Sequence, residues 1–462
     1  MTGVFARSAY VLLGVCAALV SEARPFTNDI AIPSRLYMLK GVRNEIFVKP
    51  LIKRWRPYDD FVRFDTKNGR NAFLRRLSTV ATVTNPVEGA TLDVSLVNGD
   101  EFETVKRISP LLRVAEPGLG SKEVCAQIVG DSFTHGAFFR WALLESGYVP
   151  NVRLVGLCRC AANQHAEGRG GWRLESYFRI PKGERYSYHG FMHPTDGRYW
   201  GDRSFWRMAW RCVRKTQPKG FEPTYSCARF DDFVGRFDEK TGVLLDPQEG
   251  DVQFDPALKS MVRYDGHIWR TADEKAMTWA FDYGKYLEMW GIGKPAFLFE
   301  VLGLNDFGGG TLKDDFEPFA EKLRIFKESY LKAVPDGKFV VCTPCSSCGR
   351  DDNLAGGFQT YTNARMWRFR DWLIGKFDNR EEEGWHLLDV SVATDNDYGF
   401  AIHDEKDDPA VTLPYVQYRD RAGERLYVQS GTPHPYKSYP AMGVPIAAFV
   451  QYWRDRSNDV PR

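Results

Sequence analysis

The chain has 462 residues, which exceeds one ordinary hydrophobic core and favours two domains, or one large α/β domain with an appended module. Hydrophobic residues make up 43% and charged residues 26%, a composition typical of a globular rather than a disordered protein. The formal net charge is only +2, with 62 basic and 60 acidic residues, and this balance argues against nucleic acid or an anionic membrane surface as a partner.

The first 23 residues have the pattern of a secretory signal peptide. Arg7 precedes an apolar run over residues 10–20, and residues 21–23 include small side chains suited to cleavage. The run is too short to span a bilayer, and no other stretch of the sequence could do so. We therefore expect residues 1–23 to be removed and the mature protein to be secreted or periplasmic, without a membrane span.

Residues 25–116 show short stretches of strand-like alternation and no convincing helix pattern. Leu92, Val94 and Leu96 alternate with polar residues before an Asn-Gly turn signal at residue 98. This spacing predicts a small antiparallel β-sandwich, followed by a Gly- and Pro-containing linker over residues 116–121.

From residue 122 to the end of the chain, apolar strands alternate with amphipathic helices, a pattern that predicts an α/β domain with a parallel sheet and helices on both faces. Ligands of such sheets bind at the carboxyl ends of the strands. Residues 185–272 are rich in aromatic residues and lack periodicity, so we interpret them as an insertion near the site. The expected strands are 124–129, 152–157, 296–302, 339–341 and 387–392, and the expected helices are 136–146, 273–291, 314–333, 361–376 and 441–454.

Eight of the nine cysteines lie after the signal segment, and an even number in an exported chain favours disulfides. Cys212 and Cys227 flank a short loop and are a plausible pair. The spacing Cys342-x-x-Cys345-x-x-Cys348 leaves open a zinc or iron–sulfur site, but no fourth ligand is evident nearby. Disulfides or free buried thiols are the preferred interpretation, so we expect neither a metal nor a cofactor.

The strongest chemical signal is the Gly-Asp-Ser motif that ends at Ser132. An apolar strand precedes this motif and a predicted helix follows it, so Ser132 is expected at the carboxyl end of a strand, close to a helix N-terminus. That position would expose the hydroxyl and direct backbone N–H groups toward a developing oxyanion. The alternative is that Asp131 or Ser132 only caps the helix.

Three further residues carry weaker signals. Asn305 follows a buried strand in the motif Gly-Leu-Asn-Asp and could donate its amide to an oxyanion, or belong to a simple turn. Gly168 could donate its backbone N–H at close range, or belong to a flexible turn. His434, between two prolines, has the chemistry of a general base, although this chain has seven other histidines and a lone His is usually structural.

Together, and in this order, the four motifs resemble the SGNH (GDSL-type) serine hydrolase family over roughly residues 122–455. The resemblance implies a three-layer α/β/α, flavodoxin-like parallel sheet. It also implies Ser132 as nucleophile, Gly168 and Asn305 as oxyanion donors, and His434 as base. The segment around Gly168 resembles a branch whose members often carry an N-terminal β-domain, in agreement with residues 25–116.

One position departs from the family pattern. Members usually have an Asp three residues before the His, and here that residue is Gly431. Asp395 or Asp397 could replace it, a backbone carbonyl could orient the ring in a Ser–His dyad, or the protein could be impaired. We favour the dyad, because three oxyanion donors remain in place. Ser438, where the family commonly has Gly, is a smaller departure.

The sequence therefore predicts a secreted serine esterase that hydrolyses small O-acyl esters, with acetyl esters of carbohydrate as the expected substrate. If the protein is an enzyme, the alternatives are a lipid esterase and an O-acyltransferase. If it is not, the alternative is a glycan-binding module with little or no catalysis. The sequence carries no indication of the oligomeric state.

Overall fold

A computed structural model describes the chain in segments. The predicted signal segment, residues 1–23, lies outside the described residues. The described residues are 28–53, 60–66, 74–76, 80–99, 102–134, 138–182, 188–214, 216, 230–307, 315–345, 363–396, 402–403, 416–419, 425–428, 434–435, 438–454 and 456.

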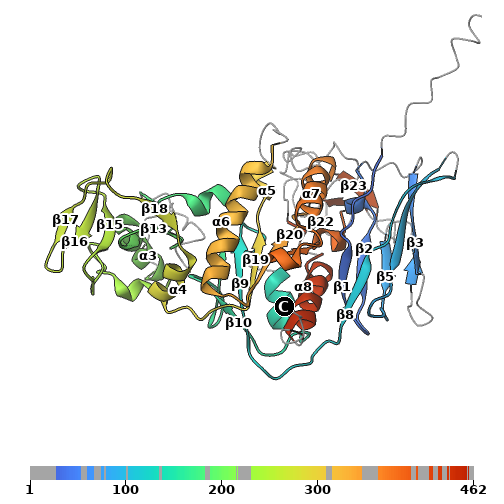
Figure 1. The fold of residues 1–462 in the computed structure, drawn as a ribbon, viewed down its shortest axis with the longest axis horizontal. Coiled ribbons are helices and arrows are strands. Elements are labelled where there is room, and N and C mark those ends of the chain that lie inside the picture. Colours follow the sequence, from blue (N-terminus) through green and yellow to red (C-terminus); the bar gives the residue numbers. More distant parts are fainter. Residues whose placement is uncertain are drawn as a thin grey trace, which may run out of the picture.

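A parallel sheet forms the centre of the molecule (Figure 1). Its parallel strands run in the order β10-β9-β19-β20-β21, which is 2-1-3-4-5 in chain order and typical of doubly wound, flavodoxin-like sheets. The α/β class predicted from the sequence is thereby confirmed. The strands are β9 (Val124–Gly130), β10 (Val152–Val155), β19 (Phe297–Val301), β20 (Lys338–Cys342) and β21 (Trp385–Leu388).

A hairpin that the sequence analysis missed extends this sheet. Strand β11 (Cys158–Ala161) pairs antiparallel with β12 (Gln164–Gly168), and the last residues of β12 pair in parallel with the end of β9. Gly168 of β12 thus lies opposite Gly130 of β9. The hairpin brings the second predicted motif to the carboxyl end of the strand that precedes Ser132.

Helices cover both faces of the central sheet. On one face lie α2 (Phe138–Arg140), which continues as the π-helix η2 (Trp141–Glu145), and α8 (Tyr439–Arg454). The rings of Phe139 and Phe449 lie 5.3 Å and 6.0 Å from the ring of Phe299 in β19.

The opposite face of the sheet is covered by three other helices. On this face α6 (Glu317–Ala333) packs Phe326 and Tyr330 against Phe339 of β20. Helix α4 packs against α6, and α7 packs against β21 (Figure 1). Their bounds are Tyr283–Trp290 and Asn363–Phe377.

The predicted helix over residues 273–291 is wrong in its first half. Strand β18 (Trp279–Phe281) occupies part of it, because these residues pair with β13 (Met192–Pro194) far away in the sequence. The helix begins only after Asp282, whose side chain accepts a hydrogen bond from the N–H of Lys285. The predicted strand 387–392 likewise ends at Leu388 and is followed by a 3-10 turn.

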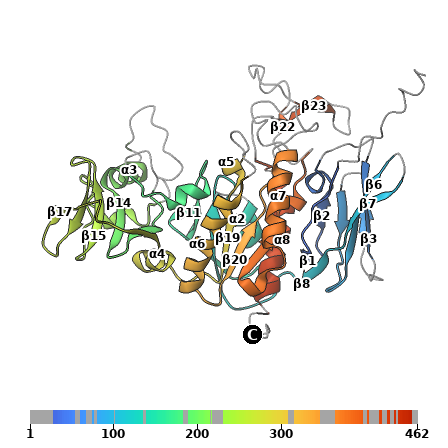
Figure 2. The same cartoon turned by 45° about the horizontal axis from the view of Figure 1, so that its top comes forward.

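The N-terminal region consists of strands with one short 3-10 helix, η1 (Lys49–Leu51), in its described part. Two three-stranded antiparallel sheets, β2-β5-β4 and β3-β6-β7, lie side by side in Figures 1 and 2. The expectation of purely antiparallel pairing is wrong in one place, since β1 pairs with β8 in parallel. The strands are β1 (Arg35–Leu39), β2 (Asn44–Phe47), β3 (Asp60–Thr66), β4 (Leu74–Arg76), β5 (Val80–Val83), β6 (Leu92–Asn98), β7 (Thr104–Ile108) and β8 (Leu111–Ala115).

The insertion folds into a lobe at the opposite end of the molecule from the N-terminal sheets (Figures 1 and 2). Its aromatic residues form a core: the rings of Trp206 and Phe237 stack at 3.7 Å, and both side chains are buried. The high aromatic content of this segment therefore has a structural explanation. The lobe contains β14 (Arg198–Asp202), β15 (Asp251–Asp255), β16 (Ser260–Tyr264), β17 (Trp269–Thr271), α3 (Arg203–Val213) and η5 (Val234–Arg236).

The remaining described elements are short. Helix α5 directly follows β19, and β22-β24-β23 form a small sheet above the carboxyl ends of the central strands (Figure 2). No helix among the described residues is long and apolar enough to cross a membrane. The bounds are η3 (Leu174–Phe178), α5 (Leu304–Phe307), η7 (Glu381–Glu383), η8 (Ser391–Ala393), β22 (Ile402–His403), β23 (Val416–Arg419) and β24 (Arg425–Val428).

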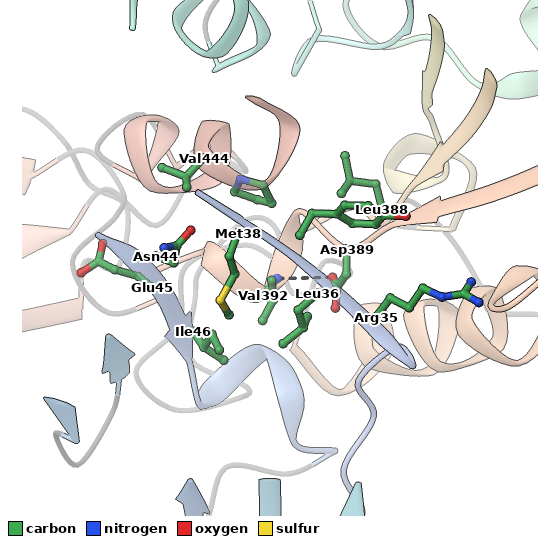
Figure 3. Close-up of a pocket in the computed structure, with 12 residues that line it drawn as sticks. Arg35, Leu36, Met38, Asn44, Glu45, Ile46, Leu388, Asp389, Val392 and Val444 are labelled. Atoms are coloured by element: carbon green, nitrogen blue, oxygen red, sulfur yellow. Dashed lines mark hydrogen bonds between the residues drawn. The ribbon is translucent and has the colours of Figure 1, made fainter. Parts of the chain in front are cut away.

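A buried ion pair joins the N-terminal region to the central domain. Arg370 of α7 forms a salt bridge with Asp389, and both side chains are almost completely buried. The same guanidinium donates to the carbonyls of Ala31 at 2.7 Å and Pro50 at 3.3 Å. Figure 3 shows Asp389 at the edge of a small pocket between β1, β2 and the segment after β21, where it also accepts the N–H of Val392.

We expect Arg370→Met to lower the free energy of unfolding by about 3–5 kcal/mol, because it leaves the Asp389 carboxylate buried without its partner. The double variant Arg370→Met/Asp389→Leu should regain part of that loss. Urea unfolding measures both values. Arg324→Met, which removes exposed ion pairs on α6, is the control and should change little. Equal losses in Arg370→Met and Arg324→Met would contradict a special role for the buried pair.

Candidate active site

The structure brings Ser132 and His434 together, although 302 residues separate them in the chain. The Nε2 atom of His434 lies 2.8 Å from the Oγ atom of Ser132, within hydrogen-bond distance. The His434 ring also packs against Phe133, with ring centroids 5.1 Å apart. A partly buried imidazole in contact with a serine hydroxyl is the arrangement that a nucleophile and its base require.

A tight turn shapes the backbone at Ser132. The N–H of Phe133 donates to the Asp131 carboxylate at 3.0 Å, and the Thr134 hydroxyl donates to the Asp131 carbonyl at 2.8 Å. Gly130 permits this turn, since a Cβ there would lie 2.8 Å from the carbonyl oxygen of Val301. Residues 131–134 form a turn, and the described part of helix α2 starts at Phe138.

Asn305 lies on α5 and ties the end of β19 to the serine turn. Its Nδ2 donates to Asp131 Oδ2 at 3.0 Å and to the carbonyl of Trp172 at 3.1 Å. The chain enters α5 through Gly303, whose φ of 108° and contact with the ring of Phe369 leave no space for a side chain. The amide nitrogen that the sequence predicts as an oxyanion donor is thus anchored to both neighbouring segments.

Gly168 lies at the end of β12, buried and in register with Gly130. The N–H of the next residue, Arg169, donates to the carbonyl of Gly130 at 2.9 Å. The segments that carry Ser132, Gly168 and Asn305 therefore converge at the carboxyl ends of three neighbouring strands, and His434 reaches the same point from the segment before α8.

Three neighbouring carboxyl groups beneath the site, the buried Asp131 and Glu300 and the partly buried Asp306, were not recognised as a cluster from the sequence. Burial, with smaller contributions from one another, raises the pKa of Asp131 to about 7 and the pKa of Glu300 well above its ordinary value. Burial likewise raises the pKa of Asp306 to about 6. Glu300 within an otherwise apolar strand was the available signal.

Asp306 has a structural task in this cluster. Its carboxylate accepts the N–H of Leu174 at 3.0 Å and the N–H of Gly303 at 3.1 Å. It therefore joins the turn before α5 to the start of η3, which follows the Gly168 segment. The Asn-Asp motif consequently contributes two links: Asn305 to the serine turn and Asp306 to η3.

The group that orients His434 through its second ring nitrogen stays a prediction. Asp397 and Gly431 lie outside the described residues. Asp395 is described, and its backbone N–H donates to the hydroxyl of Ser438 at 3.0 Å. Burial lowers the pKa of His434 from its ordinary value of 6.5, so the ring is neutral at neutral pH and able to accept a proton.

The structure describes only some of the cysteines named in the sequence analysis. Cys342 and Cys345 are buried free thiols, and burial raises the pKa of both. Cys348 and Cys227 lie outside the described residues, so neither the three-cysteine site nor the pair with Cys212 is tested. Among the described residues, no group of three or more His, Cys, Asp or Glu side chains is arranged to hold a metal ion.

Comparison with known proteins found no matching family model and no matching curated protein. Among solved structures, the chain is similar to a carbohydrate esterase family 3 protein from Talaromyces cellulolyticus. The identity is 12% and the TM-score 0.31, over 73% of this chain and 100% of that one. A likeness this remote carries no argument about activity.

We expect the His434 imidazole to titrate below pH 6.5, because burial disfavours its charged form. Protonation of the ring on lowering the pH should remove the base. NMR titration of labelled histidine measures this pKa, with the signal assigned by its loss in His434→Gln. An apparent pKa above 6.5 would instead indicate a carboxylate beside the ring.

Proposed function

We propose that the chain is a secreted serine esterase of the SGNH type that hydrolyses small O-acyl esters, with acetyl groups on carbohydrate as the substrate class. The observation that carries this proposal is the 2.8 Å contact between His434 Nε2 and Ser132 Oγ at the carboxyl end of β9. The strand order and the convergence of Gly168 and Asn305 on the same point support it.

In the proposed reaction, Ser132 Oγ attacks the ester carbonyl carbon while His434 Nε2 accepts the hydroxyl proton. The tetrahedral intermediate collapses when His434 returns that proton to the leaving alcohol oxygen. The acyl group then remains on Ser132. Water next attacks the acyl carbon while His434 Nε2 accepts a water proton. The bond between the acyl carbon and Ser132 Oγ then breaks as His434 returns that proton to Oγ, which releases the acid and regenerates the serine.

The developing oxyanion needs hydrogen-bond donors that are already in position. We assign this role to the backbone N–H groups of Ser132 and Gly168 and to the Asn305 amide. In the resting structure Asn305 Nδ2 donates to Asp131 and Trp172. An oxyanion would therefore replace one of these acceptors, while the other keeps the amide in place.

The substrate class rests on the expected export of the chain and on the family resemblance. The aromatic residues of the insertion do not add to it, since Trp206, Phe237 and their neighbours form a core. A lipid esterase or an O-acyltransferase would use the same Ser132 and His434 chemistry with a different acyl or acceptor group. A binding module would show no Ser132-dependent turnover.

We expect wild-type protein to hydrolyse p-nitrophenyl acetate faster than the butyrate ester. Ser132→Ala and His434→Ala should each lower kcat by roughly a thousandfold or more, because nucleophile and base act as a unit. Release of p-nitrophenol measures the rates. Ser121→Ala and His267→Ala change exposed residues away from the site and are the matched controls.

Turnover that is unchanged in Ser132→Ala would reject the nucleophile assignment. Absence of turnover with both esters and with acetylated polysaccharides would favour the glycan-binding module. Preference for longer acyl chains would retain the mechanism and replace acetyl carbohydrate by a lipid ester.

Asn305→Ala should lower kcat by about 10²–10³-fold with little change in KM, because the lost donor acts mainly on the oxyanion of the transition state. Steady-state kinetics on p-nitrophenyl acetate measures both constants. Asn151→Ala removes an exposed amide that donates to the Ser121 carbonyl and is the control. A rise in KM at constant kcat would show that Asn305 binds substrate rather than the transition state.

A further inference from the structure

Strand β12, which carries Gly168, is held to β9 by little backbone pairing. Only Glu167 and Gly168 lie in register with β9, opposite Val129 and Gly130. One more backbone hydrogen bond follows, from Arg169 N–H to the Gly130 carbonyl at 2.9 Å. So short a ladder leaves much of the placement of Gly168 to side chains.

The residues on either side of Gly168 form a buried ion pair. Glu167 and Arg169 are 0% and 2% exposed. Because successive residues of a strand point to opposite faces, both side chains lie on the same face of the strand, opposite to the face of Gly168. The Glu167 carboxylate accepts the N–H of Leu157 at 2.6 Å, and Arg169 donates to the carbonyl of Tyr188 at 2.9 Å. The pair therefore anchors Gly168 to the start of β11 and to the base of the insertion.

Aromatic rings enclose this ion pair. The guanidinium carbon of Arg169 lies 4.9 Å from the ring centroid of Trp172 and 5.7 Å from that of Tyr177. The carbonyl of Trp172 in turn accepts a hydrogen bond from Asn305. The network around Arg169 thus reaches the third proposed oxyanion donor as well.

Tyr177 joins the two strands directly. Its hydroxyl, on η3 and fully buried, lies 2.8 Å from the Gly130 carbonyl oxygen and also contacts the Glu167 carbonyl oxygen, so the single phenolic proton is shared between these two acceptors. Gly130 comes two residues before Ser132, and Glu167 comes one residue before Gly168. One hydroxyl therefore links the backbone that leads to the nucleophile with the backbone that leads to the second oxyanion donor.

We infer that Tyr177 is a positioning residue for the proposed reaction: supported by the Glu167–Arg169 pair, it sets the separation between Ser132 and the Gly168 N–H. This inference rests on the proposed function. Tyr177 acts through the backbone carbonyls of Gly130 and Glu167 and has no contact with the acyl group in this role. Displacement of a donor by a fraction of an ångström weakens its hydrogen bond to the oxyanion, and this affects the transition state more than substrate binding.

Tyr177→Phe removes only the bridging hydroxyl. Both carbonyls keep another donor, since Gly130 still accepts the Arg169 N–H, and Glu167 still accepts the Arg169 guanidinium at 3.3 Å. The fold should therefore persist. Tyr330→Phe is the matched control, because Tyr330 is equally buried and donates to the carbonyl of Pro295 at 2.9 Å, away from the site.

We expect Tyr177→Phe to lower kcat on p-nitrophenyl acetate by about tenfold or more, with KM changed less than about twofold. Phenylboronic acid, which forms a tetrahedral adduct with an active serine, should bind more weakly in proportion to the loss in kcat. Tyr330→Phe should change neither value. Thermal unfolding of both variants separates a loss of stability from a loss of positioning.

Equal kcat and equal boronate affinity in Tyr177→Phe and Tyr330→Phe would overturn the inference. If Tyr177→Phe does not fold, Glu167→Gln tests the same network, and an unchanged kcat there would overturn the inference. Failure of the proposed function is distinguishable, because it appears in the wild type as turnover that does not depend on Ser132, and it would remove this inference as well.

Discussion

The pairing of β9 with β12 on one side and β19 on the other determines where the site lies. All three strands are parallel, so their carboxyl ends meet at one edge of the sheet, and Ser132, Gly168 and Asn305 each lie at or just beyond one of those ends. Glycine at position 130 allows this close approach, because a Cβ would contact Thr134 and the Val301 carbonyl. The order of the strands thus brings the candidate site residues together at one edge of the sheet.

Several carboxyl groups lie beneath these turns, where a buried charge without a partner would cost free energy. Asp131 and Glu300 are buried, Asp306 lies partly buried beside them, and burial raises the pKa of each. The raised pKa of Glu300 favours its uncharged form, which limits the negative charge close to the point where the proposed reaction forms an oxyanion. The buried charge of Glu167 is instead compensated by a salt bridge with the equally buried Arg169. Glu300 and Glu167 thus avoid an unpaired buried charge in two distinct ways.

The sequence was sufficient for the parts of the fold in which apolar runs decide the structure. Strands β9, β19 and β20 and helices α6 and α8 lie close to their predicted positions. The hairpin before Gly168 was missed, because the sequence Gln-His-Ala-Glu-Gly of β12 lacks an apolar run and pairs only through distant partners. Strand β18 was read as helix for the same reason, since its partner β13 lies in the insertion. His434 came from the family resemblance rather than from periodicity, because no local pattern links residues 302 positions apart.

The contacts of helix α8 connect the segment that carries His434 to the N-terminal region. The carbonyl of Pro435 accepts the N–H of Ser438, and the carbonyl of Ser438 accepts the N–H of Met442, so the segment after His434 runs directly into α8. That helix is fixed from its far side by the N-terminal region, where Tyr37 of β1 packs against Phe449 and accepts a hydrogen bond from Trp453. His434 lies five residues before Tyr439, the first residue of α8, so contacts that hold α8 also restrict the position of the proposed base. The N-terminal strands thus contribute to the placement of His434 indirectly, through their contacts with α8.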